Sequence, residues 1–322
     1  MNNQEFQNKK LKTAVLFLVF NKPDTTKQVF EAIRRAKPPR LYVAADGPRE
    51  GKLGEVERVE EVRIIATAVD WPCEVKTLFS DINLGCKKGP SEAITWFFEN
   101  EEQGIILEDD CVPHLDFFSF CENLLDHYFS DETIFVINGN NFQKGKCRGD
   151  ASYYFSKYSH NWGWATWRRA WNYYQEDIKF WPEWSNSKAF FKYLPDKVER
   201  KYWEKIFDLV YAKKLESAWD YPWMANIWYK NGLIVAPNVN LVSNIGFGEN
   251  ATHTHDKNSR FSNMSTMELS NIMHPKQVII DIEADRFAFD NVFGGKYKRF
   301  PYNWFMLPYR IFNYIFKKII AR

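Results

Sequence analysis

The chain has 322 residues, 45% of them hydrophobic, so it is long enough for one large α/β domain or two ordinary domains with a substantial core. Its 43 Lys and Arg residues nearly balance 41 Asp and Glu residues, and a net charge of +2 with scattered basic residues argues against nucleic-acid binding. The five cysteines form neither Cys-x-x-Cys zinc pairs nor an even disulfide set, so we predict a reducing, cytoplasmic compartment.

The first half of the chain alternates short apolar runs with helix-like segments, which is the pattern of a doubly wound sheet. The first apolar run follows a polar N-terminus and is too short for a signal-peptide core or a membrane span, so we interpret it as a strand. Pro23 begins the first helix, with Asp24 or Thr25 as its cap. We predict an α/β fold with a Rossmann-like, mostly parallel central sheet and helices on its faces. The expected strands are 13–20, 41–45, 73–79, the run that ends at Glu108, and 134–138, and the expected helices are 23–36, 55–69, 90–99 and 116–128.

From about residue 150 the chain changes to short strands and loops, followed by helices rich in Trp and Tyr up to about residue 215. The 13 Trp, 16 Tyr and 27 Phe residues would suit sugar rings, which have apolar C–H faces and hydroxyl edges. A large aromatic core is the alternative explanation. The segment 240–256 is expected to be a flexible loop.

The last stretch, 304–322, has the pattern of an amphipathic helix. Its apolar residues cover about half of the helical circumference, with basic residues opposite or beside them. This profile is typical of a helix at a membrane surface, and docking on the protein's own core is the alternative. The apolar set is Ile311, Phe312, Ile315, Phe316, Ile319 and Ile320, and the basic set is Arg310, Lys317, Lys318 and Arg322.

An apolar run at 104–107 ends abruptly in three consecutive carboxylates, Glu108, Asp109 and Asp110. This pattern is typical of a buried strand that delivers acids to the edge of a sheet. Adjacent carboxylates repel one another, so a folded protein usually keeps such a cluster where a cation or a proton offsets the charge. Oxygen ligands favour Mg²⁺ or Mn²⁺, which complete their shells with water and substrate phosphates. The motif therefore indicates a phosphate-bearing substrate, with three solvated acids in a turn as the alternative.

Polar residues also follow the other predicted strands, at Asn21, Asp46 and Asn83. In open α/β sheets this carboxyl edge is where ligands bind, and we expect the nucleotide there. The chain lacks both the Gly-x-Gly-x-x-Gly fingerprint and the P-loop motif, which argues against a dinucleotide dehydrogenase and a P-loop enzyme. Asp46, which precedes Gly47, would accept hydrogen bonds from a base or ribose, and a simple turn is the alternative.

Two further segments carry candidate chemistry. Asp220 stands among the rings of Trp219, Tyr221 and Trp223, and apolar surroundings raise the pKa of a carboxyl, which suits a general base. A helix cap or a paired acid is the alternative for this residue. His253, two residues before another histidine, would supply a metal or phosphate contact, or it is an ordinary surface histidine.

The motifs together resemble a GT-A glycosyltransferase, and more narrowly the N-acetylglucosaminyltransferase that begins complex N-glycans, with its bacterial relatives. The resemblance rests on the acidic motif at 105–110 with the two phenylalanines at 117–118, and on the blocks at 83–86, 162–167 and 240–246. It covers the chain from about residue 13 to residue 255.

The resemblance implies roles for individual residues. Asp110 would bind Mn²⁺ or Mg²⁺ directly, Glu108 and Asp109 would contact the sugar or ribose, and Asp220 would be the counterpart of the catalytic base. This chain departs from the family there, because Tyr221-Pro222 replaces a second acid. Many other GT-A enzymes add a C-terminal histidine to the metal, a part that His253 would play. The base pocket would lie near Asn21, Asp46 and Asn83, and the sugars would contact Trp162, Trp164 and Trp219.

These features predict a metal-dependent glycosyltransferase that moves a sugar from a nucleotide-diphosphate sugar to an acceptor hydroxyl with inversion. We expect residues 1–256 to form the transferase domain, with 1–150 binding the nucleotide sugar and 151–256 the acceptor, and 257–322 to form an extension. A basic amphipathic tail on a cytoplasmic protein suggests a glycan or lipid-linked glycan acceptor at the inner membrane face, for a bacterial surface polysaccharide. A sugar-phosphate nucleotidyltransferase and a non-catalytic carbohydrate-binding scaffold are the alternatives.

Overall fold

The computed structural model describes residues 10–215, 218–248, 256, 258–269 and 271–305. Among them, no helix is both long enough and apolar enough to cross a membrane. The first half of the chain forms β1 (Ala14–Val19), α2 (Pro23–Ala36), β2 (Arg40–Ala45), α3 (Glu55–Thr67), β3 (Glu74–Phe79), α4 (Gly85–Asn100), β4 (Gln103–Glu108), β5 (Cys111–Pro113), α5 (Leu115–His127) and β6 (Ile134–Asn138).

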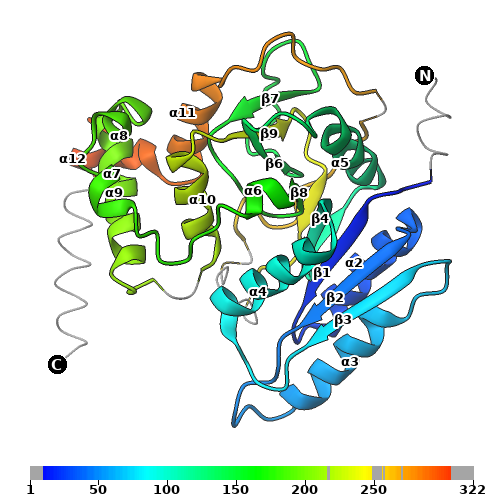
Figure 1. The fold of residues 1–322 in the computed structure, drawn as a ribbon. Coiled ribbons are helices and arrows are strands. Elements are labelled where there is room, and N and C mark those ends of the chain that lie inside the picture. The colour runs from blue at the N-terminus through cyan, green and yellow to red at the C-terminus, as the bar shows by residue number, and fades with distance from the viewer. Residues whose placement is uncertain (1–9, 216–217, 249–255, 257, 270, 306–322) are drawn as a thin grey trace.

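The second half contains shorter elements and gathers several helices beside the sheet (Figure 1). These are β7 (Tyr153–Ser156), β8 (Trp164–Trp167), α6 (Arg168–Trp171), α7 (Trp181–Trp184), α8 (Lys188–Tyr193), α9 (Lys197–Tyr211), α10 (Asp220–Tyr229), β9 (Leu233–Pro237), β10 (Val242–Asn244), α11 (Ile282–Asn291), the 3-10 helix η1 (Gly295–Lys298) and α12 (Tyr302–Phe305).

The central sheet has eight strands in the order β3-β2-β1-β4-β8-β6-β9-β7. The first four run parallel, as the alternation of strands and helices predicts. β8 lies antiparallel between β4 and β6, and β6 pairs in parallel with β9. The predicted mostly parallel α/β sheet with flanking helices is therefore confirmed.

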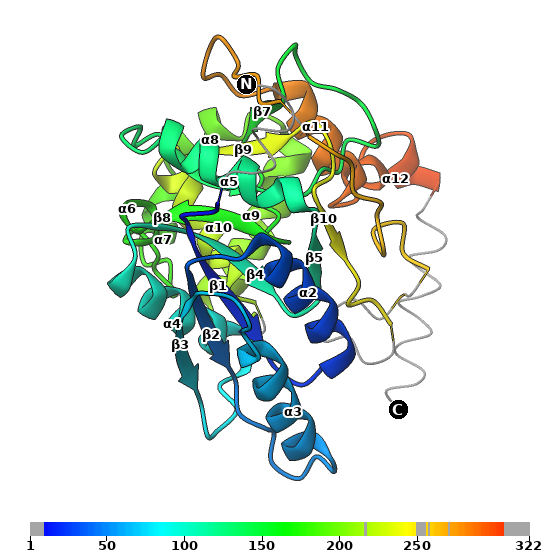
Figure 2. The same cartoon turned by 90° about the vertical axis from the view of Figure 1, so that its right-hand side faces the viewer.

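Helices cover both faces of the sheet, which is why its inner strands are continuous apolar runs. Alternate residues of β1 point to opposite faces: Val15 and Phe17 pack toward α2, α3 and α5, whereas Leu16 and Leu18 pack toward α4 and the aromatic helices. Figure 2 shows α2 and α3 together on one side of the strands, with α4 on the other. β1 and β6 are buried throughout, whereas β3 at the edge is largely exposed.

Three local expectations are wrong. Lys22, and not Asp24 or Thr25, occupies the N-cap position of α2, and no side chain caps the helix. Helix α4 begins at Gly85, five residues before its expected start, so that Pro90 lies inside it. The expected loop at 240–256 contains β10, which pairs antiparallel with β5 and so brings its residues beside the acidic motif.

Ile280 and the start of α11 pack along β7. Phe155 forms an isolated bridge with Ile280, and Asp285 of α11 accepts a hydrogen bond of 2.5 Å from the Ser156 hydroxyl. Of the expected helix at 304–322, residues 306–322 lie outside the described residues, as does His253.

Candidate active site

A cavity of about 890 Å³ opens at the carboxyl ends of β1, β2 and β4, beside the start of α4. The loop that precedes β8, the start of α10 and the end of β10 complete its wall. Several predicted site residues meet there although they are far apart in the chain: Asp46, Asn83, Glu108, Asp109, Asp110, Trp162 and Asp220. A space of this size is ample for a nucleotide-sized ligand.

Asp46 organises one wall of the cavity through hydrogen bonds to the protein itself. Its carboxylate accepts from the backbone N–H groups of Leu84 at 2.7 Å and Gly85 at 3.0 Å, and from the Asn83 side-chain amide at 3.0 Å. These bonds cap α4 from a distant strand, which explains its early start. Burial raises the pKa of Asp46, although the backbone donors oppose that rise. The Asn83 amide also donates to the carbonyl of Gly47 at 2.8 Å, so both residues chiefly shape the wall.

Asn21 lies behind this wall and is not part of the lining. Its side-chain amide donates to Glu55 Oε1 at 2.8 Å, and Arg49 pairs with the same carboxylate. The Arg49 hydrogen bond lowers the pKa of Glu55 to about 2. The guanidinium of Arg49 also lies 5.4 Å from the ring centre of Phe20, and both residues line the cavity. They offer a flat, partly cationic surface of the kind that stacks on a nucleobase.

The acidic triplet lies at the floor of the cavity, where β4 ends. Asp109 accepts a hydrogen bond of 3.0 Å from the backbone N–H of Phe20, which fixes its side chain against β1. The Asp110 carboxylate forms an ion pair of 3.0 Å with the ammonium of Lys22. Burial, and then the neighbouring carboxylates, raise the pKa values of Glu108 and Asp109. This electrostatic strain is what a bound divalent cation would relieve.

The donor set fits a hard cation. Ligand atoms of Glu108, Asp110 and Cys111 lie within 4.8 Å of one another. The Cys111 thiol donates a hydrogen bond to Asp110 Oδ1, with its sulfur 3.5 Å from that oxygen. Burial raises the pKa of Cys111 well above the ordinary value, so the side chain stays a protonated thiol. The carboxylate oxygens are therefore the atoms that could hold a cation, and Asp110 already pairs with the Lys22 ammonium there.

β10 holds the acidic motif from the opposite side. The Ile245 N–H donates to the Asp110 carbonyl at 2.8 Å, and the Gly246 N–H donates to the Asn244 side chain at 2.9 Å. A methyl group at position 246 would lie only 2.5 Å from Cγ of Asp110, and closer still to Oδ2. Glycine is therefore required for the carboxylate to occupy its place.

Asp220 lies in the first turn of α10, and its Oδ1 accepts the Tyr221 N–H at 3.0 Å. Its charge contributes to the raised pKa of Glu108, and both residues line the same cavity. The buried Trp219 supports this turn and stacks on Trp164, with ring centres 5.6 Å apart.

Of the three tryptophans predicted to contact sugars, Trp162 and Trp164 have different positions. Trp162 is half-buried and lines the cavity, with its ring edge-on to Phe142 and Phe247. Trp164 is 0% exposed and packs in the core beneath Trp219, so it supports the wall and does not touch the cavity. The cause is the turn at Gly163, whose φ of +68° redirects the chain into β8.

The polar cavity residues that were not predicted include Lys22, Arg49 and His160. Burial lowers the pKa of His160 to about 3, so its ring is neutral. Lys22 was recognisable in principle, since it follows β1 at the edge where the acids cluster. Arg49 and His160 carry no such signal, because only the tertiary fold directs their loops to the cavity.

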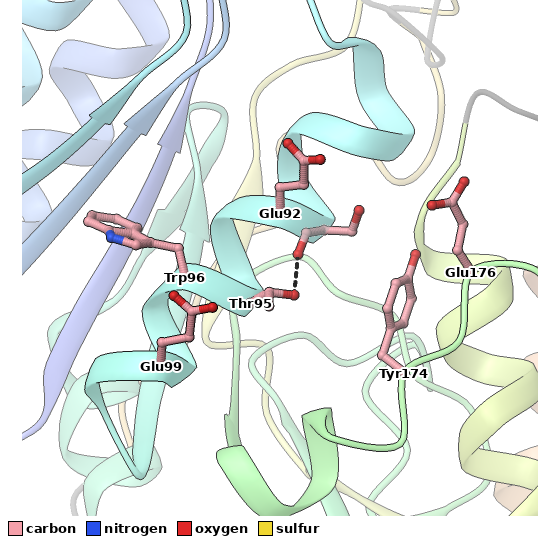
Figure 3. Close-up of a pocket in the computed structure, with 7 residues that line it drawn as sticks. Glu92, Thr95, Trp96, Glu99, Tyr174 and Glu176 are labelled. Atoms are coloured by element: carbon pink, nitrogen blue, oxygen red, sulfur yellow. Dashed lines mark hydrogen bonds between the residues drawn. The ribbon is translucent and has the colours of Figure 1, made fainter.

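A second, shallower pocket of about 370 Å³ lies along the outer side of α4 (Figure 3). Figure 3 shows Glu92, Thr95 and Trp96 on the helix, with Tyr174 and Glu176 opposite them. Glu92 lines both pockets, which therefore adjoin. Two acids of the shallower pocket already form ion pairs with lysines, Glu92 with Lys88 and Glu176 with Lys87.

No protein-family model and no curated protein matches the chain. Among solved structures, HddC from Yersinia pseudotuberculosis is similar with a TM-score of 0.31 and 9% sequence identity, over 49% of this chain and 77% of that one. The 4-diphosphocytidyl-2C-methyl-D-erythritol synthase of Anaerococcus prevotii is similar with a TM-score of 0.31 and 7% sequence identity. The match covers 58% of this chain and 85% of that one. Likenesses this weak carry no functional information, and they leave the site itself as the guide.

Proposed function

We propose that the chain is a metal-dependent glycosyltransferase that moves a sugar from a nucleotide-diphosphate sugar to an acceptor hydroxyl with inversion. One observation carries the proposal: Asp110 and Asp220 line one cavity, Asp110 paired with the Lys22 ammonium and Asp220 next in the chain to Trp219 and Tyr221, which line the same cavity. The cavity thus holds one carboxylate that pairs with a cation and a second carboxylate in a different environment, as acid–base chemistry with two carboxylates requires.

Each side of the cavity would take one part of the reaction. Asp220 accepts the proton of the acceptor hydroxyl while that oxygen forms its bond to the anomeric carbon. The bond from that carbon to the diphosphate breaks on the opposite face, and its electron pair leaves with the diphosphate. When bound at Asp110, Mn²⁺ or Mg²⁺ would offset the negative charge of the leaving diphosphate. Trp162 offers its ring to a sugar face, and Phe20 with Arg49 offers a surface to the base.

The test is a screen of UDP, GDP, dTDP and CMP sugars, with Mn²⁺ or with a chelator, that measures nucleotide release. We expect metal-dependent turnover with one donor. Asp110→Asn should reduce this turnover by about 10²-fold or more, since it removes a charged metal ligand. Asp126→Asn is the matched control, because this acid is exposed on α5 and does not line the cavity.

A sugar-phosphate nucleotidyltransferase would use the same acids and Lys22 on a nucleoside triphosphate. That activity would require a Gly-rich basic loop after the first strand. Only residues 20–22 separate β1 from α2, and none of them is glycine. Release of pyrophosphate from a nucleoside triphosphate and a sugar 1-phosphate would favour this alternative. If no donor or triphosphate reacts, and calorimetry detects no nucleotide binding, a non-catalytic scaffold becomes the better explanation.

We further propose a membrane-bound acceptor, such as a lipid-linked glycan. Exposed aromatic residues at the end of the described chain, among them Phe300 at 80% and Trp304 at 67% exposure, stand beside Lys296 and Lys298. Aromatic and basic side chains together suit an anionic bilayer surface. Flotation with anionic liposomes should be lost from a chain cut before Trp304, and unchanged flotation would exclude this role for residues 304–322.

A further inference from the structure

The acid proposed as the metal ligand already has a cationic partner within the chain. Lys22 Nζ lies 3.0 Å from Asp110 Oδ2, and both side chains are mostly buried, at 21% and 15% exposure. Of the described residues that line the cavity, only Lys22 and Arg49 carry a permanent positive charge, and Arg49 is committed to Glu55. Lys22 is thus the cation that faces the acidic motif.

The backbone of Lys22 is held firmly by the start of α2, whereas its side chain lines the cavity and is held by the ion pair with Asp110. Its carbonyl accepts hydrogen bonds from the Thr26 N–H at 3.0 Å and the Thr26 hydroxyl at 2.7 Å, and α2 begins at the next residue. A lysine ammonium is a compact charge on a flexible stem, so it can change partner without moving the helix.

An ammonium and a divalent cation cannot both bind Asp110 Oδ2 at full strength, because each takes the same lone pairs and the same negative charge. We propose that Lys22 is the resident counter-ion of Asp110, that Mn²⁺ or Mg²⁺ displaces it, and that the freed ammonium then pairs with the diphosphate of the donor. This inference rests on the proposed function, since it concerns the same metal and donor.

The exchange couples the two ligands. A metal ion that arrives alone must break the Lys22 ion pair, whereas a metal ion that arrives with a diphosphate supplies Lys22 with a new anion. By linkage, the diphosphate strengthens metal binding and the metal strengthens diphosphate binding by the same factor. Lys22 therefore favours a site that fills with metal and donor together.

The first test is Mn²⁺ binding without donor, measured by calorimetry or electron paramagnetic resonance. Lys22→Gln should bind Mn²⁺ about tenfold more tightly than the native chain, because the competing ammonium is gone. Lys22→Met should behave in the same way. Lys22→Arg keeps the competing charge and should stay near the native affinity. Lys27→Gln removes an equal charge from an exposed position on the same helix and serves as the matched control.

The second test is donor binding at saturating Mn²⁺, with the donor that the nucleotide-sugar screen identifies. Lys22→Gln should raise the donor KM by about tenfold, because a charge-assisted contact to the diphosphate is lost. Circular dichroism and thermal melting establish that each variant is folded.

The outcomes separate this inference from the proposed function. Tighter Mn²⁺ binding with weaker donor binding in Lys22→Gln supports the exchange. If the native chain binds Mn²⁺ and Lys22→Gln binds it equally or less tightly, the exchange is refuted while the metal site stands. If no variant binds Mn²⁺, the metal site is refuted, and the proposed function and this inference are refuted with it.

Discussion

Gly246→Ala is expected to disable the site through a single methyl group. The backbone at Gly246 is not in the left-handed region, so alanine is compatible with its conformation. The cost therefore arises from contact, since the new Cβ would lie 2.5 Å from Cγ of Asp110 while ordinary contact needs at least 3.4 Å. The carboxylate or the 244–246 backbone must move by about 1 Å to restore ordinary contact, and that movement takes the carboxylate out of its present place.

A displacement of this size has a predictable magnitude. Moving a catalytic group by about 1 Å can reduce turnover by about 10²-fold, and overpacking a buried site costs about 1–3 kcal/mol of stability. We therefore expect Gly246→Ala to weaken Mn²⁺ binding and to lower turnover by about 10²-fold. Calorimetry with Mn²⁺ and the nucleotide-release assay measure the two effects independently.

Gly89→Ala is the matched control for folding and metal binding. A Cβ at Gly89 would lie 3.6 Å from the nearest atom, Asp46 Oδ2, which is ordinary contact. Because Gly89 is inside α4, alanine should stabilise the chain by roughly 0.5–1 kcal/mol and leave Mn²⁺ affinity unchanged. If Gly246→Ala keeps native Mn²⁺ affinity and native turnover, Asp110 is not the group that binds the metal.

Three other variants test the remaining groups. Asp220→Asn should lower kcat by about 10²–10⁴-fold with little change in donor affinity, and a kcat near the native value would rule it out as the base. Burial raises the pKa of Asp285 to about 7, so the folded chain holds its proton more tightly than the unfolded chain and loses stability as pH rises from about 4 through 7. In urea unfolding, the free energy of unfolding of Asp285→Asn should rise relative to that of the native chain over this pH range. A difference between the two chains that stays constant with pH would contradict this prediction. Burial and the stacked ring of His127 lower the pKa of His274, so the free energy of unfolding should fall with acidification below about pH 6.5. His274→Gln should reduce that loss of stability, and equal losses in the variant and the native chain would refute this prediction.

Local sequence pattern was sufficient to predict much of the first half of the chain. The apolar runs that became β1 and β4 are buried on both faces, and a run buried in this way is recognisable without knowing its neighbours. The acids at 108–110 had to emerge at the carboxyl edge, because β4 ends at Glu108. This much follows from residue spacing along a single strand.

Local sequence pattern could not predict which strands and residues become neighbours. β8 lies between β4 and β6 and runs antiparallel to both, a choice that depends on hydrogen bonds to strands distant in the chain. The start of α4 depends on Asp46, 38 residues before Leu84. Trp162 and Trp164 look alike in the sequence, yet one lines the cavity and the other supports it.

The sequence by itself therefore determined the α/β class, the buried strands and the chemistry of the acidic motif, because hydrophobic periodicity and residue type act over a few neighbouring positions. Only the tertiary structure decided that Lys22 pairs with Asp110, that Gly246 leaves room for that carboxylate, and that Asp220 lines the same cavity. The physical reason is that charge pairing and steric fit act over a few ångströms of space, and these residues become neighbours only when the sheet edge, β10 and α10 have come together.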